Sequence, residues 1–325
     1  MKALRTPDER FESLPGYPFP PHYTDVPDGD GGTLQIHHVD EGPSDAQPRA
    51  REHMIPVLTG AGLRVLAPDL VGYGRSDKPS TREDYSFQRQ VDWLSAWLVQ
   101  NDVRGATLVG QDWGGLIGLR LVTGNPERFD RVVIANSGLP LPENVPTERA
   151  EAVRAFRASP EPVTLPDVMA ALGSPNREAP ERTFAYWQKW CWETEDMPIG
   201  VMIAGTVDGR TLMPEEIAAY DAPFPDPSYK MAARAMPSQV PTLSDDPSLP
   251  AQRRAWEVLS KWEKPFLCAF SDNDPVTGGA DRLLRERIPG SSGQPHTTIE
   301  GGGHFLQEGR GEELARIVAA FVTST

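Results

Sequence analysis

One short segment carries the residue types of a nucleophilic site: Gly110-Gln111-Asp112-Trp113-Gly114-Gly115. An apolar run precedes it and a helical pattern follows it, so it would form a tight strand-to-helix turn in which Gly110 and Gly114 relieve the crowded backbone. The positive end of the following helix would face the Asp112 carboxylate. The pattern predicts a turn that presents a nucleophile, with aspartate where serine is more usual. The alternative is a glycine-rich connection with a solvated aspartate.

An aspartate nucleophile restricts the reaction that the site could catalyse. A carboxylate is ionised near neutral pH without the help of a base, and it attacks best at a saturated carbon that bears a leaving group. The product of that attack is an ester of the enzyme. Its hydrolysis needs a water molecule activated by a histidine, which a second carboxylate would orient. We therefore expect an acid and a histidine further along the chain.

Both residues occur downstream of Asp112. Asp274 lies in the loop after the apolar run 265–270, and His304 follows three glycines and precedes a helix expected from Glu308. Asp272 competes with Asp274 as the orienting acid, and its alternative role is to cap a turn. Asp274 is favoured because it lies further into the loop. The other histidines are expected in strand, surface or structural positions: His22, His37, His38, His53 and His296.

Tryptophans offer the groups that an anionic leaving group requires. The indole N–H of Trp113 could donate a hydrogen bond but could not accept a proton. Its alternative role is a core side chain. Trp187, Trp190 and Trp192 recur at helical spacing further along the chain, a pattern that usually indicates packing.

Apolar runs and helical patterns alternate around these residues. Strands are predicted at 32–40, 63–70, 106–110, 131–135, 265–270 and 297–299, and amphipathic helices at 82–101 and 114–123. Alternation of this kind predicts an α/β fold with a mostly parallel sheet.

The stretch 138–259 differs from the rest, because it is proline-rich and shows helical periodicity without convincing strands. An insertion at this point would cover the edge of the sheet where α/β proteins bind ligands. We expect a core of residues 1–137 and 260–325 with a helical cap at 138–259.

Composition excludes several classes of protein. The 325 residues carry a net charge of −14, which disfavours nucleic acids and anionic membranes as partners. Cys191 and Cys268 cannot form a disulfide framework, and no run is long enough to span a bilayer. Residues 1–23 hold charges and prolines rather than the apolar stretch of a signal peptide. We expect a cytoplasmic protein, acting as a monomer.

Several segments together resemble the haloalkane dehalogenases of the α/β-hydrolase superfamily, whose order of nucleophile, acid and histidine this chain shares. They are APDLVGYGRSDKP at 67–79, the QDWGG turn, NSGLP at 136–140, YDAPFP at 220–225 and GHF at 303–305. The resemblance implies that Asp112 is the nucleophile, His304 the base and Asp274 its partner. It also implies that Trp113 and Trp187 hold the halide. Asn136 occupies the place where another branch of the family carries its acid.

The resemblance implies an activity as well. Small apolar haloalkanes and water would give an alcohol, a halide ion and a proton, without a metal or an organic cofactor. The segment 143–182 is longer than we expect for this family, so the shape of the pocket stays open.

One departure from the family pattern has a chemical consequence. Between Asp40 and Leu63 the chain lacks the family's apolar strand and its His-Gly-x-Pro loop, roughly a dozen residues. That strand would lie mid-sheet, so its neighbours would pair directly or leave a gap. The loop supplies a backbone N–H of the oxyanion hole and a side chain that helps to hold the halide. We therefore expect slow activity, limited by ester hydrolysis, with alkylated enzyme accumulating.

Two other functions stay open from the sequence. An epoxide hydrolase shares an aspartate nucleophile followed by tryptophan, but it activates the epoxide oxygen with cap tyrosines, for which Tyr186, Tyr220 and Tyr229 are candidates. The missing segment instead favours a catalytically silent relative that binds a small apolar ligand.

Overall fold

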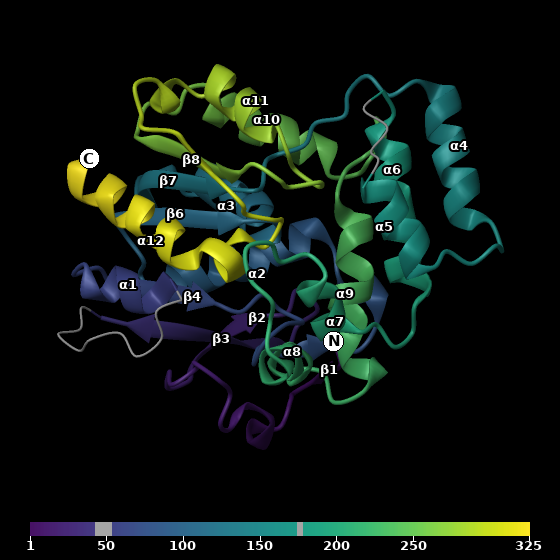
Figure 1. Ribbon diagram of the computed structural model, residues 1–325, viewed down its shortest axis with the longest axis horizontal. Coiled ribbons are helices and arrows are strands. Elements are labelled where there is room, and N and C mark those ends of the chain that lie inside the picture. Colours follow the sequence, from purple (N-terminus) through teal and green to yellow (C-terminus); the bar gives the residue numbers. More distant parts are fainter. Residues whose placement is uncertain (43–53, 174–177) are drawn as a thin grey trace.

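The computed structural model describes residues 1–42, 54–173 and 178–325 (Figure 1). The strands of these residues form three sheets. A short antiparallel pair joins β1 (Ala3–Leu4) and β5 (Lys78–Pro79), and an antiparallel sheet has the order β2 (His22–Pro27), β3 (Thr33–Glu41), β4 (Val65–Pro68). A parallel sheet has the order β6 (Ala106–Gln111), β7 (Phe129–Ala135), β8 (Phe266–Ser271), β9 (Thr297–Ile299).

Two groups of helices accompany the sheets. Those next to the strands are α1 (Met54–Gly60), α2 (Phe87–Gln100), α3 (Trp113–Gly124), α10 (Leu249–Leu259), α11 (Ala280–Arg287) and α12 (Leu306–Ser324). Those between β7 and α10 are α4 (Thr147–Ala158), α5 (Leu165–Gly173), α6 (Pro180–Glu193), α7 (Ile199–Ala204), α8 (Pro214–Asp221) and α9 (Met231–Ala235). No described helix is long and apolar enough to cross a membrane.

The parallel sheet is covered on both faces. Along β7 and β8, successive side chains alternate between two cores, as the period of a strand requires. Val132, Ile134 and Phe266 pack with α2, α3 and α10, whereas Val133 and Leu267 pack with α1 and α12. The expected parallel sheet and its βαβ unit are therefore confirmed.

The sheet is interrupted where the sequence lacks a strand. Within the described residues β4 and β6 share no ladder, so the structure shows a gap rather than direct pairing. Interior strands of such sheets are buried on both faces, and β8 is buried along its whole length. By contrast, all of β4 is only half-buried, and Val109 in β6 keeps 38% of its surface exposed. Both strands therefore have the exposure of edge strands.

The strand β2 was not predicted from the sequence. Its residues, HYTDVP, are mostly polar, and Val26 is the one fully buried side chain among them. An edge strand with a single buried residue gives no alternating signal, although its backbone pairs with β3 over six residues.

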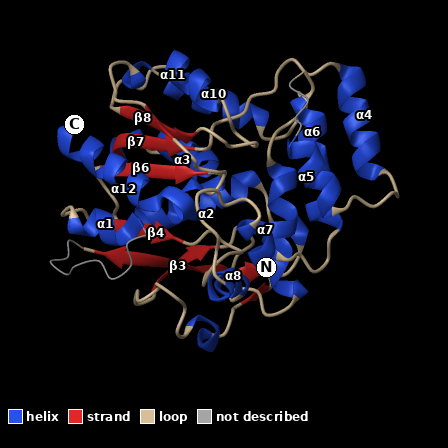
Figure 2. Ribbon diagram, in the orientation of Figure 1, coloured by secondary structure: helices blue, strands red, loops and turns tan. Residues whose placement is uncertain are grey.

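The helices from α4 to α9 lie beside the strand-rich part, in a region of helices and loops (Figure 2). A separate apolar cluster holds part of this region together, around Val168, Trp190, Met197 and Phe224. The following helix, α10, packs instead on α3. Its Trp256 indole N–H also donates a hydrogen bond to the Leu139 carbonyl, in the segment after β7.

Candidate active site

Asp112 occupies the turn between β6 and α3. Its backbone has φ 46° and ψ −125°, a conformation that L-residues rarely adopt. Two hydrogen bonds hold the turn: Asp112 N donates to the Asn136 carbonyl at 3.2 Å, and Ser137 Oγ donates to the Asp112 carbonyl at 2.7 Å. Strain that the surrounding structure maintains in this way is typical of functional sites.

The glycines around Asp112 differ in importance. A Cβ on Gly110 would lie 2.7 Å from Gly115 Cα, and a Cβ on Gly115 would lie 2.2 Å from Ser137 Oγ. Gly114 faces open space. The expectation that Gly114 relieves the crowding is therefore wrong, because the close contact, made by Ser137 just after β7, falls on the next residue, Gly115.

The structure brings Asp112, His304 and Asp274 together. His304 Nδ1 lies 3.0 Å from Asp274 Oδ1, and His304 Nε2 lies 3.5 Å from Asp112 Oδ1. The Asp274 side chain is fully buried and that of His304 is 8% exposed, whereas the Asp112 carboxylate keeps 36% exposure. The carboxylate proposed to attack is thus the accessible one, and the carboxylate behind the imidazole is shielded from water.

Asp274 is held by its own loop. Its carboxylate accepts a hydrogen bond from Val276 N at 2.8 Å and another from Thr277 Oγ1. The competing acid, Asp272, is exposed and accepts from Gly301 N at 2.9 Å, which is the turn role considered for it.

The two carboxylates determine the charge of the imidazole. Burial alone would lower the pKa of His304, but hydrogen bonds and charge from Asp112 and Asp274 outweigh it and raise the pKa to about 10. Burial also opposes ionisation of Asp274, yet the contact with His304 and the Thr277 and Val276 hydrogen bonds keep its pKa below the usual value. The contacts with both carboxylates therefore favour the imidazolium form of His304 at neutral pH.

Asn136 ties three loops together beneath this site. It is fully buried with φ 41°, and its Nδ2 donates to the carbonyls of Gly303 and His304 at 2.8 and 3.0 Å. Its Oδ1 accepts from Ser271 N at 2.9 Å. Gln111 Nε2 adds a bond to the His304 carbonyl at 3.0 Å. The sequence indicated Asn136 only as a position without an acid, since this network joins segments more than 130 residues apart.

The two candidate halide donors lie on different elements. Trp113 begins α3 and packs edge-on against Phe87, and Trp187 lies on α6, stacked on Trp190. Neither indole N–H has an acceptor in the part of the chain that the structure describes. Tyr73 packs against the clusters that contain Trp113 and Trp187, and besides burial the charge of Asp112 raises its pKa. Tyr73 thus connects the turn to the cap cluster.

The remaining histidines differ in setting. His296 accepts from Cys268 N at Nδ1 and contacts the Ser291 carbonyl at 2.8 Å, a structural role. His37 and His38 are buried on β3 and His22 is exposed on β2, while His53 lies outside the described residues.

Two of the three candidate cap tyrosines contact residues outside the site around Asp112. Tyr186 packs on Phe156 of α4, and the Tyr220 hydroxyl hydrogen bonds with Glu308. Among the described residues, no group of three or more His, Cys, Asp or Glu side chains could hold a metal ion.

Comparisons with known proteins identify the relatives of this chain. The sequence model of the α/β hydrolase fold family matches residues 42–187. A haloalkane dehalogenase of Psychrobacter cryohalolentis is 46% identical, over 99% of this chain and 98% of the relative. Haloalkane dehalogenase 1 of Mycobacterium tuberculosis is 43% identical over the full length of both chains. That alignment spans 336 positions, 11 more than the 325 residues of this chain.

A solved structure shows the same architecture. The haloalkane dehalogenase DpaA of Paraglaciecola agarilytica, described as a tetramer, is 30% identical with a TM-score of 0.75, over 100% of this chain and 99% of that chain. Because the Psychrobacter and Mycobacterium relatives are 43–46% identical over nearly the full length of both chains and the fold is shared, the chain belongs to the haloalkane dehalogenase family.

Proposed function

We propose that this protein hydrolyses carbon–halogen bonds of small haloalkanes through an ester on Asp112. The observation that carries the proposal is the accessible Asp112 carboxylate on its strained turn, 3.5 Å from an imidazole that the buried Asp274 orients. The family of the relatives supports the same chemistry.

The reaction would proceed in two displacements. An Asp112 oxygen forms a bond to the halogen-bearing carbon as the carbon–halogen bond breaks, and the halide leaves with the electron pair. The indole N–H groups of Trp113 and Trp187 would donate to it. Water then attacks the Asp112 carbonyl carbon, losing a proton to His304 Nε2. The bond between that carbon and the alkyl oxygen then breaks, the alkyl oxygen takes the proton from His304 and leaves as the alcohol, and the Asp112 acid gives up its proton to solvent and is a carboxylate again.

Esterification would change the state of the base. While Asp112 is charged, it helps to hold the His304 pKa at about 10, so the imidazole carries its proton. The ester is neutral and removes that contribution, which lowers the pKa of His304 and favours the neutral imidazole. His304 would therefore become a base when water has to be activated.

Of the two steps, hydrolysis of the Asp112 ester is the one that the missing segment would impair. It develops an oxyanion, which α/β-hydrolases stabilise with the N–H after the nucleophile and an N–H from the loop after the third strand. The first donor corresponds to Trp113 N, which as the first residue of α3 has no intrahelical partner. The second belongs to the segment that the sequence lacks.

Substrate comparison tests the proposed function. With a bromoalkane the protein should release bromide, whereas with an epoxide of the same carbon skeleton it should form no diol. Trp187→Phe removes one indole donor and should reduce bromide release about tenfold or more. Trp192→Phe, on the same helix, is the matched control and should leave bromide release nearly unchanged. Diol formation without bromide release would favour the epoxide hydrolase instead.

Protonation of His304 also predicts how stability depends on pH. Its pKa is raised from 6.5 to about 10 on folding, so its stabilising contribution is complete below pH 6.5 and lost as the pH rises through about 10. The free energy of unfolding should therefore fall over this range, by at most about 1.4 kcal/mol per pH unit from this group. Urea unfolding of wild type and His304→Gln measures it, and the variant should show the shallower slope. Equal slopes would contradict an imidazolium between two carboxylates.

We also propose that the helices α4 to α9, within the expected stretch 138–259, act as the cap, that α10 belongs to the core because it packs on α3, and that the chain works as a cytoplasmic monomer. The absence of strands between β7 and α10, in the residues that are described, supports the cap. The scattering of exposed large apolar side chains over separate elements, such as Val99, Met169, Val201 and Leu283, supports the monomer.

A further inference from the structure

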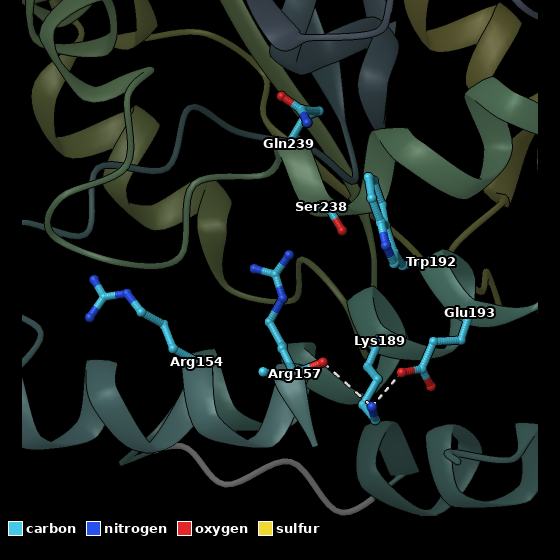
Figure 3. Close-up of a pocket in the computed structure, with 8 residues that line it drawn as sticks. Arg154, Arg157, Lys189, Trp192, Glu193, Ser238 and Gln239 are labelled. Atoms are coloured by element: carbon cyan, nitrogen blue, oxygen red, sulfur yellow. Dashed lines mark hydrogen bonds and ion pairs between the residues drawn. The ribbon is translucent and has the colours of Figure 1, made fainter. Parts of the chain in front are cut away.

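A pocket of about 390 Å³ lies between α4, α6 and the 3₁₀ helix η5 (Met236–Gln239), and neither Asp112 nor His304 lines it (Figure 3). Three cations line it, Arg154, Arg157 and Lys189, with the single carboxylate of Glu193. The whole chain carries a net charge of −14, so this concentration of positive charge is unusual for the protein.

Two of the three cations are already satisfied. The Lys189 ammonium donates to the Ser159 carbonyl at 2.6 Å, to the Arg157 carbonyl at 3.4 Å and to Glu193. Arg154 pairs with Asp245. The ammonium and the Arg154 guanidinium therefore have little need of a further anion.

Arg157 is different. Its half-buried guanidinium has neither a carboxylate nor another acceptor within contact in the described residues, and Asp246 acts on it only at longer range. Burial lowers its pKa. A partly desolvated guanidinium without a counter-ion is stabilised by an anion, and its planar fork matches a carboxylate.

The opposite side of the pocket supplies a second donor and an apolar wall. Ser238 Oγ is buried and has no hydrogen-bond partner. The Trp192 indole forms part of the lining. The backbone of Trp192 is held in place by hydrogen bonds that Arg82 and Arg234 donate to its carbonyl at 2.7 and 3.3 Å. Figure 3 shows the Arg157 and Ser238 side chains directed into the pocket from different elements.

We propose that this pocket binds a small organic carboxylate with an apolar body. The carboxylate accepts from the Arg157 fork and from Ser238 Oγ, and the body lies against Trp192. Trp187 and Trp192 are five residues apart on α6, which places them about 140° apart around the helix, and Trp187 packs into the cap cluster instead. The site is therefore separate from the proposed reaction site, and its failure would leave the hydrolase proposal intact.

Phenylacetate is a suitable probe, and isothermal titration calorimetry of the full chain at low salt measures its binding. Phenylacetate should bind with a stoichiometry of one, and phenylacetamide, which has the same body without the charge, should bind at least about tenfold more weakly. Arg157→Gln should weaken phenylacetate binding at least about tenfold, and Ser238→Ala should weaken it by a smaller factor. Thermal melts show whether each variant is folded.

The matched control is Arg154→Gln, which removes a pocket cation that already has a partner and should change binding less than about threefold. Three results would each overturn the proposal. They are no binding at millimolar phenylacetate, binding that survives Arg157→Gln in a folded protein, and equal losses in the Arg154 and Arg157 variants, which would mean general attraction to positive charge.

Discussion

Protein incubated with excess 1-bromobutane is expected to accumulate a butyl ester on Asp112. The first displacement needs an accessible carboxylate and a place for the halide, and the Asp112 side chain keeps 36% exposure. It develops no oxyanion, so the missing loop affects it mainly through weaker halide binding. The second displacement has lost one of two oxyanion donors, which typically costs about a hundredfold in rate or more.

The alkylated fraction of the protein at steady state reports the ratio of the rate of alkylation to the rate of ester hydrolysis. Intact-mass spectrometry should show most of the protein carrying one butyl group, and fragmentation should place the group on Asp112. Asp112→Asn should show none, while His304→Gln, which lacks the base for hydrolysis, sets the level of complete labelling.

Two outcomes would contradict different parts of the argument. Steady bromide release with little labelled protein would mean that ester hydrolysis does not limit turnover, although the nucleophile stands. If the protein formed no adduct and released no bromide, the proposal that Asp112 is a nucleophile would be overturned.

The fold and the site differ in how much the sequence could predict. Parallel strands covered on both faces are continuous apolar runs, so β6, β7 and β8 were predicted within a few residues. The turn around Asp112 was predictable because Gly110 is needed where β6 meets the start of α3, whereas the need for Gly115 comes from Ser137 and was not predicted. These signals are local in the chain.

The rest depends on contacts between distant segments. The strand β2 is recognisable only by its pairing with β3, and Asn136 acquires its role only when the ends of β7 and β8 meet the His304 loop. The uncompensated charge of Arg157 is likewise visible only once α4 faces α6 and η5. No spacing along the chain carries that information.

Restoring the missing strand and loop should have the largest positive effect. We would insert the strand and His-Gly-x-Pro loop of a haloalkane dehalogenase between Glu41 and Met54, about a dozen residues. We expect steady-state turnover to rise about a hundredfold or more, because the second oxyanion donor returns. The alkylated fraction with 1-bromobutane should fall correspondingly.

Stability should rise in the same protein, for a separate reason. An added strand between β4 and β6 would pair with both, and it would cover Val109 and the half-buried side chains of β4. Each new backbone hydrogen bond contributes about 0.5 to 1.5 kcal/mol net, and burial of the valine adds to it. Hydrogen exchange at β4 and β6 should slow, and the melting temperature should increase by several degrees.

An insert of equal length made of glycine and serine is the matched control. It lengthens the same connection without offering apolar side chains or a positioned donor, so it should improve neither turnover nor exchange protection. If the family insert protected β4 and β6 while ester hydrolysis stayed slow, the second donor would not be the limiting group. The slow step would then lie with His304, whose neutral form depends on the loss of charge at Asp112. Turnover would in that case rise with pH, whereas a deficient oxyanion hole affects the rate at every pH.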